Sequence, residues 1–404
     1  MTQTSTERQP ASPAIQRLSL ISAILASTIA TIDASAVNVA LPAISRNLGG
    51  GLATQQWISN AYLLSLGALI LLAGSLTDRI GERRIFLLGV AGFGAASVLC
   101  ALAPNTAMLI AARAIQGATS AMLTPASLAV IVAVFPRDLR GAAIGRWTAW
   151  GGIGILIGPL IGGQIVDVAS WRWIFLLNVP IVLVTLALAM RTLPKRSMRR
   201  LQDSPLDYGG AALAAISLTC ISFALIEQPV LGWAHLGIWV PLVVGTGLFG
   251  AFIAYEARVK SPMLPLKMFR QRNFSVTNAQ TFAMYGSLSI LGFFMTIFLQ
   301  QVAGYSALKA GATGLVPTIV MFALSARFGH LADRHGPRLF MTVGPLVMSA
   351  GFALLLRFGT SVSLLTDVLP ALLVFSLGLA MTVAPLTATV LADADDNNAG
   401  IASA

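Results

Sequence analysis

Long apolar runs separated by short polar segments make up most of the chain from residue 18 onwards. A bilayer core is spanned by about 20 apolar residues in a helix, and about twelve runs reach that length. We place the predicted spans at residues 18–41, 53–75, 84–104, 106–134, 141–166, 171–191, 208–228, 237–257, 274–300, 308–328, 337–357 and 366–391. Gly and Pro inside these runs are compatible with membrane helices. The pattern predicts an all-α, polytopic membrane protein.

Composition supports the membrane class. Of the 404 residues, 56% are hydrophobic and only 10% are charged, whereas a soluble domain carries roughly 25% charged residues. The net charge of +11 could indicate a nucleic-acid partner, but the basic residues cluster on one side of the predicted spans. With the N-terminus in the cytoplasm, the exceptions are Arg46, Arg172, Lys309 and Arg357 in outer segments and Arg113 within a span. This bias is typical of a multi-pass protein of the cell membrane, and we expect no nucleic-acid partner.

A charged turn occurs twice between apolar runs, as GSLTDRIGERR from Gly74 and GHLADRHGPR from Gly329. The copies share residues at a constant spacing: Gly74, Asp78, Arg79 and Gly81 in the first, and Gly329, Asp333, Arg334 and Gly336 in the second. One such loop would be an ordinary orientation signal, but two in register predict related halves. Transporters with parallel repeats have this organisation, with the substrate site between the halves. Gly81 and Gly336 suit tight turns, and Gly74 and Gly329 allow close helix approach.

The first copy resembles the cytoplasmic signature of the major facilitator superfamily, Gly-x-Leu-x-Asp-Arg-x-Gly-x-Arg-Arg/Lys. In that family the aspartate and arginines form a latch that holds the two halves together on the cytoplasmic side. The resemblance implies a latch built from these residues: Gly74, Asp78, Arg79, Gly81 and Arg83, with Asp333 and Arg334 as the counterpart. Glu82 departs from the basic residue often found there.

The fifth span contains GGIGILIGPLIGG, a run rich in glycine. Gly154, Gly158 and Gly162 recur every four residues and therefore share one helix face. Pro159 removes a backbone donor and tends to kink the helix. Together with Gly163, the run resembles the signature associated with the antiporters of the same superfamily, which implies export. Ordinary packing of small residues is the alternative explanation of the glycines.

Three polar residues lie deep in the apolar runs of the first half. Arg113 and Gln116 match the family's Arg-x-x-Gln-Gly motif, and an arginine in a span costs from about 3 kcal/mol upward unless it is paired or functional. Asp33 lies about 8 Å and Arg113 about 10 Å below the outer face of the bilayer core, from the helical rise and the core thickness. In the resembled family helices 1 and 4 line the central cavity of the first bundle. We therefore predict that Asp33 and Arg113 face each other across that cavity, directly or through water, and, with Gln116, couple protons to substrate. A static pair that holds two helices in register is the alternative.

The segments IDASAVNVALPAI and WRWIFLLNVPI resemble the fourteen-helix drug:proton antiporter branch. The resemblance implies two bundles with two extra helices between them. We expect a six-helix bundle at 1–193, a basic linker with the extra helices at 194–272, and the second bundle at 273–404. The second bundle would hold four helices instead of six, so we expect a truncated product, with a protein that departs from its relatives as the alternative.

These features predict proton-coupled export of small hydrophobic or cationic compounds by alternating access. A metabolite permease on the same fold is the alternative, and a membrane-embedded enzyme or a scaffold explains the duplicated turn less well. We expect no catalytic, cofactor or metal site, and a monomer whose partners are substrate, protons and lipid. Candidate pocket residues are Met284, Tyr285, Phe293, Phe294 and Met295, with ordinary packing of a Met and aromatic stripe as the alternative.

Overall fold

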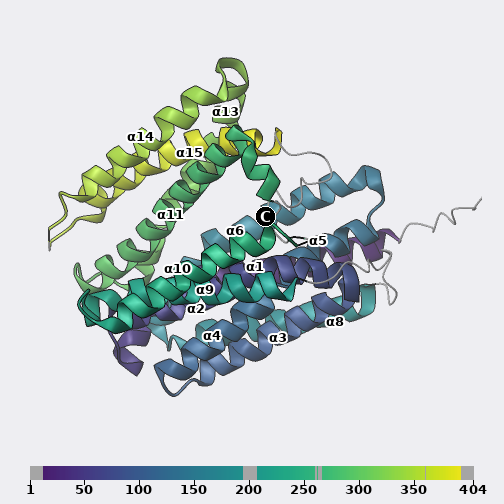
Figure 1. The fold of residues 1–404 in the computed structure, drawn as a ribbon, viewed down its shortest axis with the longest axis horizontal. Helices are drawn as coiled ribbons and strands as arrows, with labels where there is room; N and C mark the ends of the chain where they lie inside the picture. The colour runs from purple at the N-terminus through teal and green to yellow at the C-terminus, as the bar shows by residue number, and fades with distance from the viewer. Residues whose placement is uncertain (1–11, 194–206, 260–261, 263–265, 360, 393–404) are drawn as a thin grey trace, which may run out of the picture.

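The computed structural model describes residues 12–193, 207–259, 262, 266–359 and 361–392. In this part of the chain, helices joined by short turns make up the fold (Figure 1), and 12 segments are long and apolar enough to cross a membrane. They lie at the positions of the predicted spans, so the expected all-α, polytopic fold is confirmed. The linker at 194–206 and the chain end at 393–404 lie outside the described residues.

The first half of the molecule is formed by helices α1 to α8. Their bounds are α1 (Pro13–Leu48), α2 (Leu52–Ile80), α3 (Glu82–Leu102), α4 (Thr106–Ser120), α5 (Leu123–Val134), α6 (Arg137–Val168), α7 (Arg172–Leu176) and α8 (Asn178–Thr192). Local signals fix where helices begin: Asn105 accepts a hydrogen bond from the backbone N–H of Met108 at 2.9 Å and so caps α4. Helix α1 lies centrally and packs against α5, α6 and α8.

Helices α9 (Tyr208–Leu231) and α10 (Leu236–Glu256) form a hairpin that docks on α2. Asp207 caps α9 by accepting from the backbone N–H of Gly210 at 2.7 Å. The indole N–H of Trp57 on α2 donates to Glu227 Oε1 at 2.8 Å, and its ring lies 5.9 Å from that of Phe223. The hairpin is therefore attached to the first half by both polar and apolar contacts. The proposed division at residues 194 and 273 stays a prediction.

The second half follows the hairpin. Its elements are the short helical turn η1 (Leu266–Arg270), α11 (Arg272–Gln301), α12 (Ala307–Ala312), α13 (Leu315–His335), α14 (Pro337–Leu355), the short turn η2 (Leu364–Val368) and α15 (Leu369–Ala392). Helix α15 packs against α11, α13 and α14. The rings of Phe352 and Phe375 meet edge to face at 5.3 Å between α14 and α15. Small residues at Gly344, Gly351 and Gly378 let these two backbones approach closely.

The repeated turns have the glycine conformation that the sequence predicts. Gly81 between α2 and α3 has φ 102°, and Gly336 between α13 and α14 has φ 86°, values that favour glycine. The close helix approach expected at the other two glycines is not seen in this conformation. A Cβ at Gly74 would lie 3.9 Å from Pro125 Cβ, and one at Gly329 would lie 3.5 Å from Ala384 Cβ, which are ordinary contact distances.

The two halves meet at one end of the molecule, which we call the closed end. There α1 and α6 contact α11 and α12. Asp167 of α6 accepts from the backbone N–H groups of Ala307 and Leu308, each at 2.9 Å, and Gln300 Nε2 donates to the Val39 carbonyl at 2.9 Å. Toward the opposite end, where α1 begins, the ribbons of α13 to α15 diverge from the first half (Figure 1). We call this the open end.

Candidate functional site

A cavity of about 700 Å³ lies between the two halves. Its first-half wall comes from α1, α2, α4 and α6 and carries polar side chains, among them Asn38, Gln56, Ser59, Asn60 and Arg113. Its second-half wall comes mainly from α11, α13 and α15 and is largely apolar and aromatic. A concave site with an apolar wall and a few polar groups is the usual form of a small-molecule binding site.

Most of the predicted pocket residues line this cavity. Tyr285, Phe293, Phe294 and Met295 of α11 contribute to its wall. Met284 does not, because its side chain is buried in the hydrophobic core of the second half. For Met284 the alternative of ordinary packing holds, since neighbouring residues on a helix point in directions about 100° apart.

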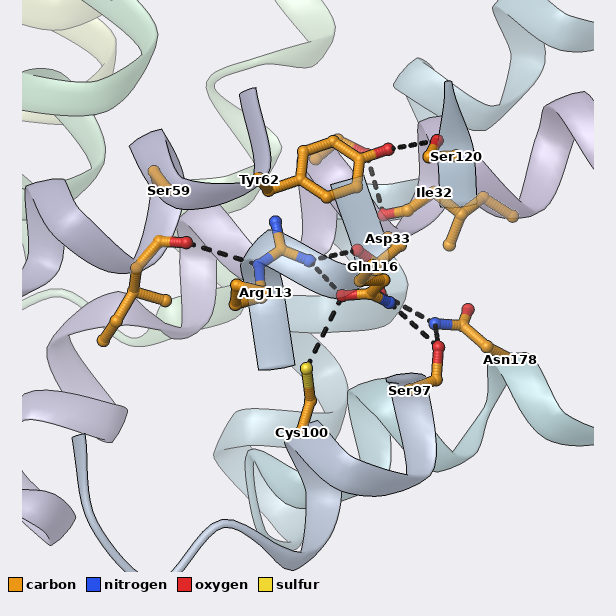
Figure 2. A network of polar contacts seen from close by, with 12 residues as sticks. Ile32, Asp33, Ser59, Tyr62, Ser97, Cys100, Arg113, Gln116, Ser120 and Asn178 are labelled. Atoms are coloured by element: carbon orange, nitrogen blue, oxygen red, sulfur yellow. Dashed lines mark hydrogen bonds and ion pairs between the residues drawn. The ribbon is translucent and has the colours of Figure 1, made fainter. Parts of the chain in front are cut away.

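Asp33 and Arg113 form a buried ion pair inside the first half. Arg113 Nη1 lies 2.5 Å from Asp33 Oδ2, and the two side chains are 2% and 0% exposed (Figure 2). Arg113 also borders the cavity, whereas Asp33 lies behind it. The structure thus brings the two predicted residues into direct contact. This is the direct form of the predicted contact, and it lies in the packed interior of one bundle. The coupling role of the pair stays a prediction.

Gln116, Ser97 and Asn178 extend the pair into a network (Figure 2). Gln116 Oε1 accepts from Arg113 Nη1 at 2.6 Å, and Gln116 Nε2 donates to Asp33 Oδ1 at 3.0 Å and to Ser97 Oγ at 2.9 Å. Asn178 Nδ2 donates to Asp33 Oδ1 at 2.7 Å and to Ser97 Oγ at 3.2 Å. Three N–H donors, from Arg113, Gln116 and Asn178, therefore converge on the two carboxylate oxygens of Asp33.

The guanidinium of Arg113 is held between this network and the cavity. Its Nε donates to the Ile58 carbonyl at 3.3 Å, and its carbon lies 4.3 Å from the centre of the Tyr62 ring and 5.9 Å from that of Phe175. Nη2 has no hydrogen-bond partner among the described residues. Breaking a buried, hydrogen-bonded ion pair costs about 3–5 kcal/mol, so the pair persists until a proton, a ligand or a helix movement compensates its loss.

The glycine-rich run of α6 contacts two different elements. Gly154, Gly158 and Gly162 pack on α1, where a Cβ at Gly162 would lie 2.8 Å from Ala36 Cβ. Gly163 faces α12, and a Cβ there would lie 2.5 Å from the Leu308 Cα. Helix α6 continues through Pro159, whose carbonyl oxygen lies against Gly311 of the second half. The motif residues therefore border both α1 and the contact between the halves.

The latch residues lie toward the open end. Arg83 Nη2 donates to the Met190 carbonyl of α8 at 3.0 Å, a contact within the first half. Asp78 is half-buried, and Arg79, Asp333 and Arg334 are exposed. Because the halves diverge toward this end (Figure 1), the latch between them stays a prediction.

Four residues of the buried network and of the contact between the halves were not predicted from the sequence. Ser97, Asn178 and Tyr62 belong to the network or cover it, and Asp167 joins the halves. The available signal was a polar side chain inside or at the end of an apolar run, as for Asn178 in WRWIFLLNVPI.

Comparison with known proteins shows relatives over nearly the whole chain. The chain is 34% identical over 399 residues to the uncharacterized MFS-type transporter EfpA of Mycobacterium tuberculosis, covering 96% of this chain and 73% of EfpA. It is 35% identical to the puromycin resistance protein pur8 of Streptomyces alboniger, covering 95% and 77%. It is 32% identical to the tetracenomycin C resistance and export protein of Streptomyces glaucescens, covering 92% and 69%.

Solved structures share the fold. A bacterial homolog of the human lysosomal transporter Spinster, in an inward-facing and unoccupied conformation, superposes with a TM-score of 0.66 at 18% identity, covering 97% of this chain and 78% of that chain. The peptide transporter POT in complex with sulfate superposes with a TM-score of 0.68 at 16% identity, covering 95% and 84%. The family model described as Major Facilitator Superfamily matches residues 23–404. The chain is thus a multi-pass membrane protein that belongs to the Major Facilitator Superfamily.

Proposed function

We propose that this chain exports small, largely apolar compounds from the cell in exchange for protons, by alternating access between its two halves. The observation that carries the proposal is the buried Asp33–Arg113 pair, which adjoins a cavity between the halves. An ionisable pair inside a membrane span marks a functional site by default. Relatives named for antibiotic resistance and export support export of drug-like compounds.

The proposed orientation puts the open end in the cytoplasm of a cell-membrane protein. Helix α1 begins at that end (Figure 1), and the basic turns at Gly81 and Gly336 follow α2 and α13, which run toward it. Basic residues accumulate on the cytoplasmic side of membrane proteins. The conformation described here is then inward-facing, with its cavity ready to take substrate from the cell. Both halves come from one chain, so a monomer is the proposed working unit.

Coupling follows from the position of Arg113 between Asp33 and the cavity. In the present conformation the ionised pair is closed at 2.5 Å. When the halves rock to the outward-facing state, a change in the separation or hydration of the pair alters the proton affinity of Asp33. A proton taken up outside and released inside would then drive export. Ligands and protons shift such an equilibrium only through different affinities for the two states.

A permease for polar metabolites on the same fold is the second candidate. It would need polar groups around the whole site to replace the hydration of its substrate. The second-half wall is instead apolar and aromatic, with Tyr285, Phe293, Phe294 and Phe322 among its residues. This observation favours export of amphipathic compounds over transport of polar metabolites.

The test is transport by purified protein in inside-out vesicles with an acidified interior. We expect a fluorescent dye to accumulate inside, because protons leaving the vesicle correspond to protons entering the cell. The ionophore nigericin should abolish accumulation by collapsing the pH difference, and vesicles without protein provide the baseline. Accumulation that persists after nigericin would contradict proton coupling.

A further inference from the structure

The electrostatic character of the cavity is set by a single charged side chain. Among the described residues that line it, Arg113 alone is charged, and no aspartate or glutamate is present. The positive charge of Arg113 is balanced by Asp33 at 2.5 Å. The pair therefore presents no net charge to a compound that enters. This observation gives no support to the cationic substrates expected from the sequence.

The first-half wall offers hydrogen bonds that the protein itself does not use. Gln56 and Asn60 line the cavity, and their side-chain amides have no hydrogen-bond partner among the described residues. Arg113 borders the same space, and its Nη2 likewise has no hydrogen-bond partner among the described residues. Gln56 and Asn60 lie four residues apart on α2, and Arg113 lies on α4 in the same wall. We call these three residues the amide strip. Carbonyl, ether or sulfonyl oxygens of an uncharged ligand can accept from their N–H groups.

The opposite wall is suited to the apolar body of a ligand. Tyr285, Phe294 and Phe322 line the cavity and are 48%, 44% and 67% exposed. The rings of Phe293 and Phe294 meet edge to face at 5.2 Å. Aromatic side chains stack on flat rings with centroid distances of about 4.5–7 Å. The wall can therefore hold a ring system while the amide strip holds its polar edge.

We propose that the substrate is an uncharged, ring-bearing amphiphile, with its acceptor oxygens on the amide strip and its rings on the aromatic wall. This inference rests on the proposed export function and narrows its substrate class. Charged compounds are disfavoured because a buried ion without a partner loses its hydration without compensation. A cation finds no carboxylate on the wall, and an anion finds a guanidinium that Asp33 already neutralises.

A matched probe series tests the charge preference by binding alone. Dansylamide, monodansylcadaverine and dansylglycine share one fluorophore and are respectively neutral, cationic and anionic at neutral pH. Titration into purified protein in neutral detergent, followed by dansyl emission, gives three Kd values, with detergent alone as the background. We expect dansylamide to bind at least about tenfold more tightly than either charged probe. Equal or tighter binding of the cation or the anion overturns the proposal.

A charge-inserting variant provides the complementary test. Asn60→Asp keeps the side-chain shape and places one carboxylate on the cavity wall. Ser75→Asp adds the same charge to an exposed position of α2 outside the lining. We expect Asn60→Asp to raise the affinity for monodansylcadaverine about tenfold, since a buried opposite charge stabilises the cation, and Ser75→Asp to leave it unchanged. An unchanged affinity in Asn60→Asp, or an equal gain in both variants, contradicts the site.

The binding series tests the substrate class and the export assay tests proton coupling, so one claim can be contradicted without the other. Gradient-independent transport would remove proton coupling while leaving the order of the three Kd values intact. A preference for the charged probes would remove the proposed substrate class while leaving proton-driven export intact.

Discussion

Asp167 is the residue that joins the halves most directly. Its two carboxylate oxygens each accept a backbone N–H at the start of α12, from Ala307 and from Leu308. Ser306 caps the same helix from within the second half through the Lys309 N–H. The N-terminal N–H groups of a helix otherwise lack intrahelical partners, so a carboxylate from the other half can satisfy them. Asp167 therefore stabilises the conformation that is closed at this end.

Asp167→Asn should weaken the closed end. Only one side-chain oxygen remains as an acceptor and the charge is lost, so we expect a loss of about 1–2 kcal/mol for this conformation. Spin labels at Val168→Cys and Val302→Cys, both exposed positions, report the separation of the halves in a Cys220→Ser background. The variant should gain a population at longer distance.

The control for this experiment is Asp367→Asn. Asp367 accepts from the Ser363 backbone N–H at 2.8 Å, a contact within the second half. The substitution removes a similar carboxylate that accepts a backbone N–H, but it leaves the interface between the halves unchanged. If both variants give the wild-type distance distribution, Asp167 does not hold the closed end.

The buried network shows how far residue-level prediction reaches. Depth along two helices placed Asp33 and Arg113 at similar levels, because helical rise is nearly constant. It did not place Asp33 behind Arg113, since the rotation of a helix about its axis depends on packing. Ser97 and Asn178 were missed for the same reason: a single Ser or Asn in an apolar run has no partner until the helices are assembled.

At the scale of elements, α6 makes close contacts both within the first half and with the second half. One face, with Gly154, Gly158 and Gly162, fits against α1 within the first half. The neighbouring Gly163 approaches α12 of the second half. The four-residue spacing predicted a shared face but not its partner. Close packing at these positions needs the absence of a side chain. A Gly→Ala substitution should therefore destabilise the protein at a glycine that contacts another helix, and have little effect at one that does not.

Gly158→Ala should destabilise the first half. The new Cβ would collide with Ser35 Oγ and lie 2.9 Å from the Ile32 carbonyl oxygen, and such overpacking typically costs about 1–3 kcal/mol. Thermal unfolding of the purified protein, followed by tryptophan emission, should show a lower Tm. Gly145→Ala is the matched control on the same helix, because a Cβ there meets nothing within 4 Å. Equal Tm values for the two variants would contradict the packing argument.

At the scale of the whole molecule, the duplicated charged turn predicted two related halves, and the structure separates them around one cavity. The sequence could not predict which end is closed, because both conformations of a rocking transporter contain the same helices and the same local signals. The choice depends on a few contacts between the halves, such as those of Asp167 and Gln300. Only the assembled molecule reveals them.

The central claim is that Asp33 couples protons to export, and Asp33→Asn tests it most directly. The amide keeps the size of the side chain but cannot titrate. It also leaves Arg113 less compensated, so the variant is first checked for folding by its elution from a sizing column and by dansylamide binding. Exchange of dye across the vesicle membrane without a pH gradient then shows that the variant still alternates between its inward-facing and outward-facing conformations.

The decisive measurement is dye accumulation in inside-out vesicles as a function of the imposed pH difference, for wild type and Asp33→Asn. We predict that the wild type concentrates the dye in proportion to the gradient. Asp33→Asn should equilibrate the dye but not concentrate it at any pH difference. If Asp33→Asn concentrates the dye with the wild-type dependence on the gradient, Asp33 is not the coupling carboxylate and the pair with Arg113 is a static support.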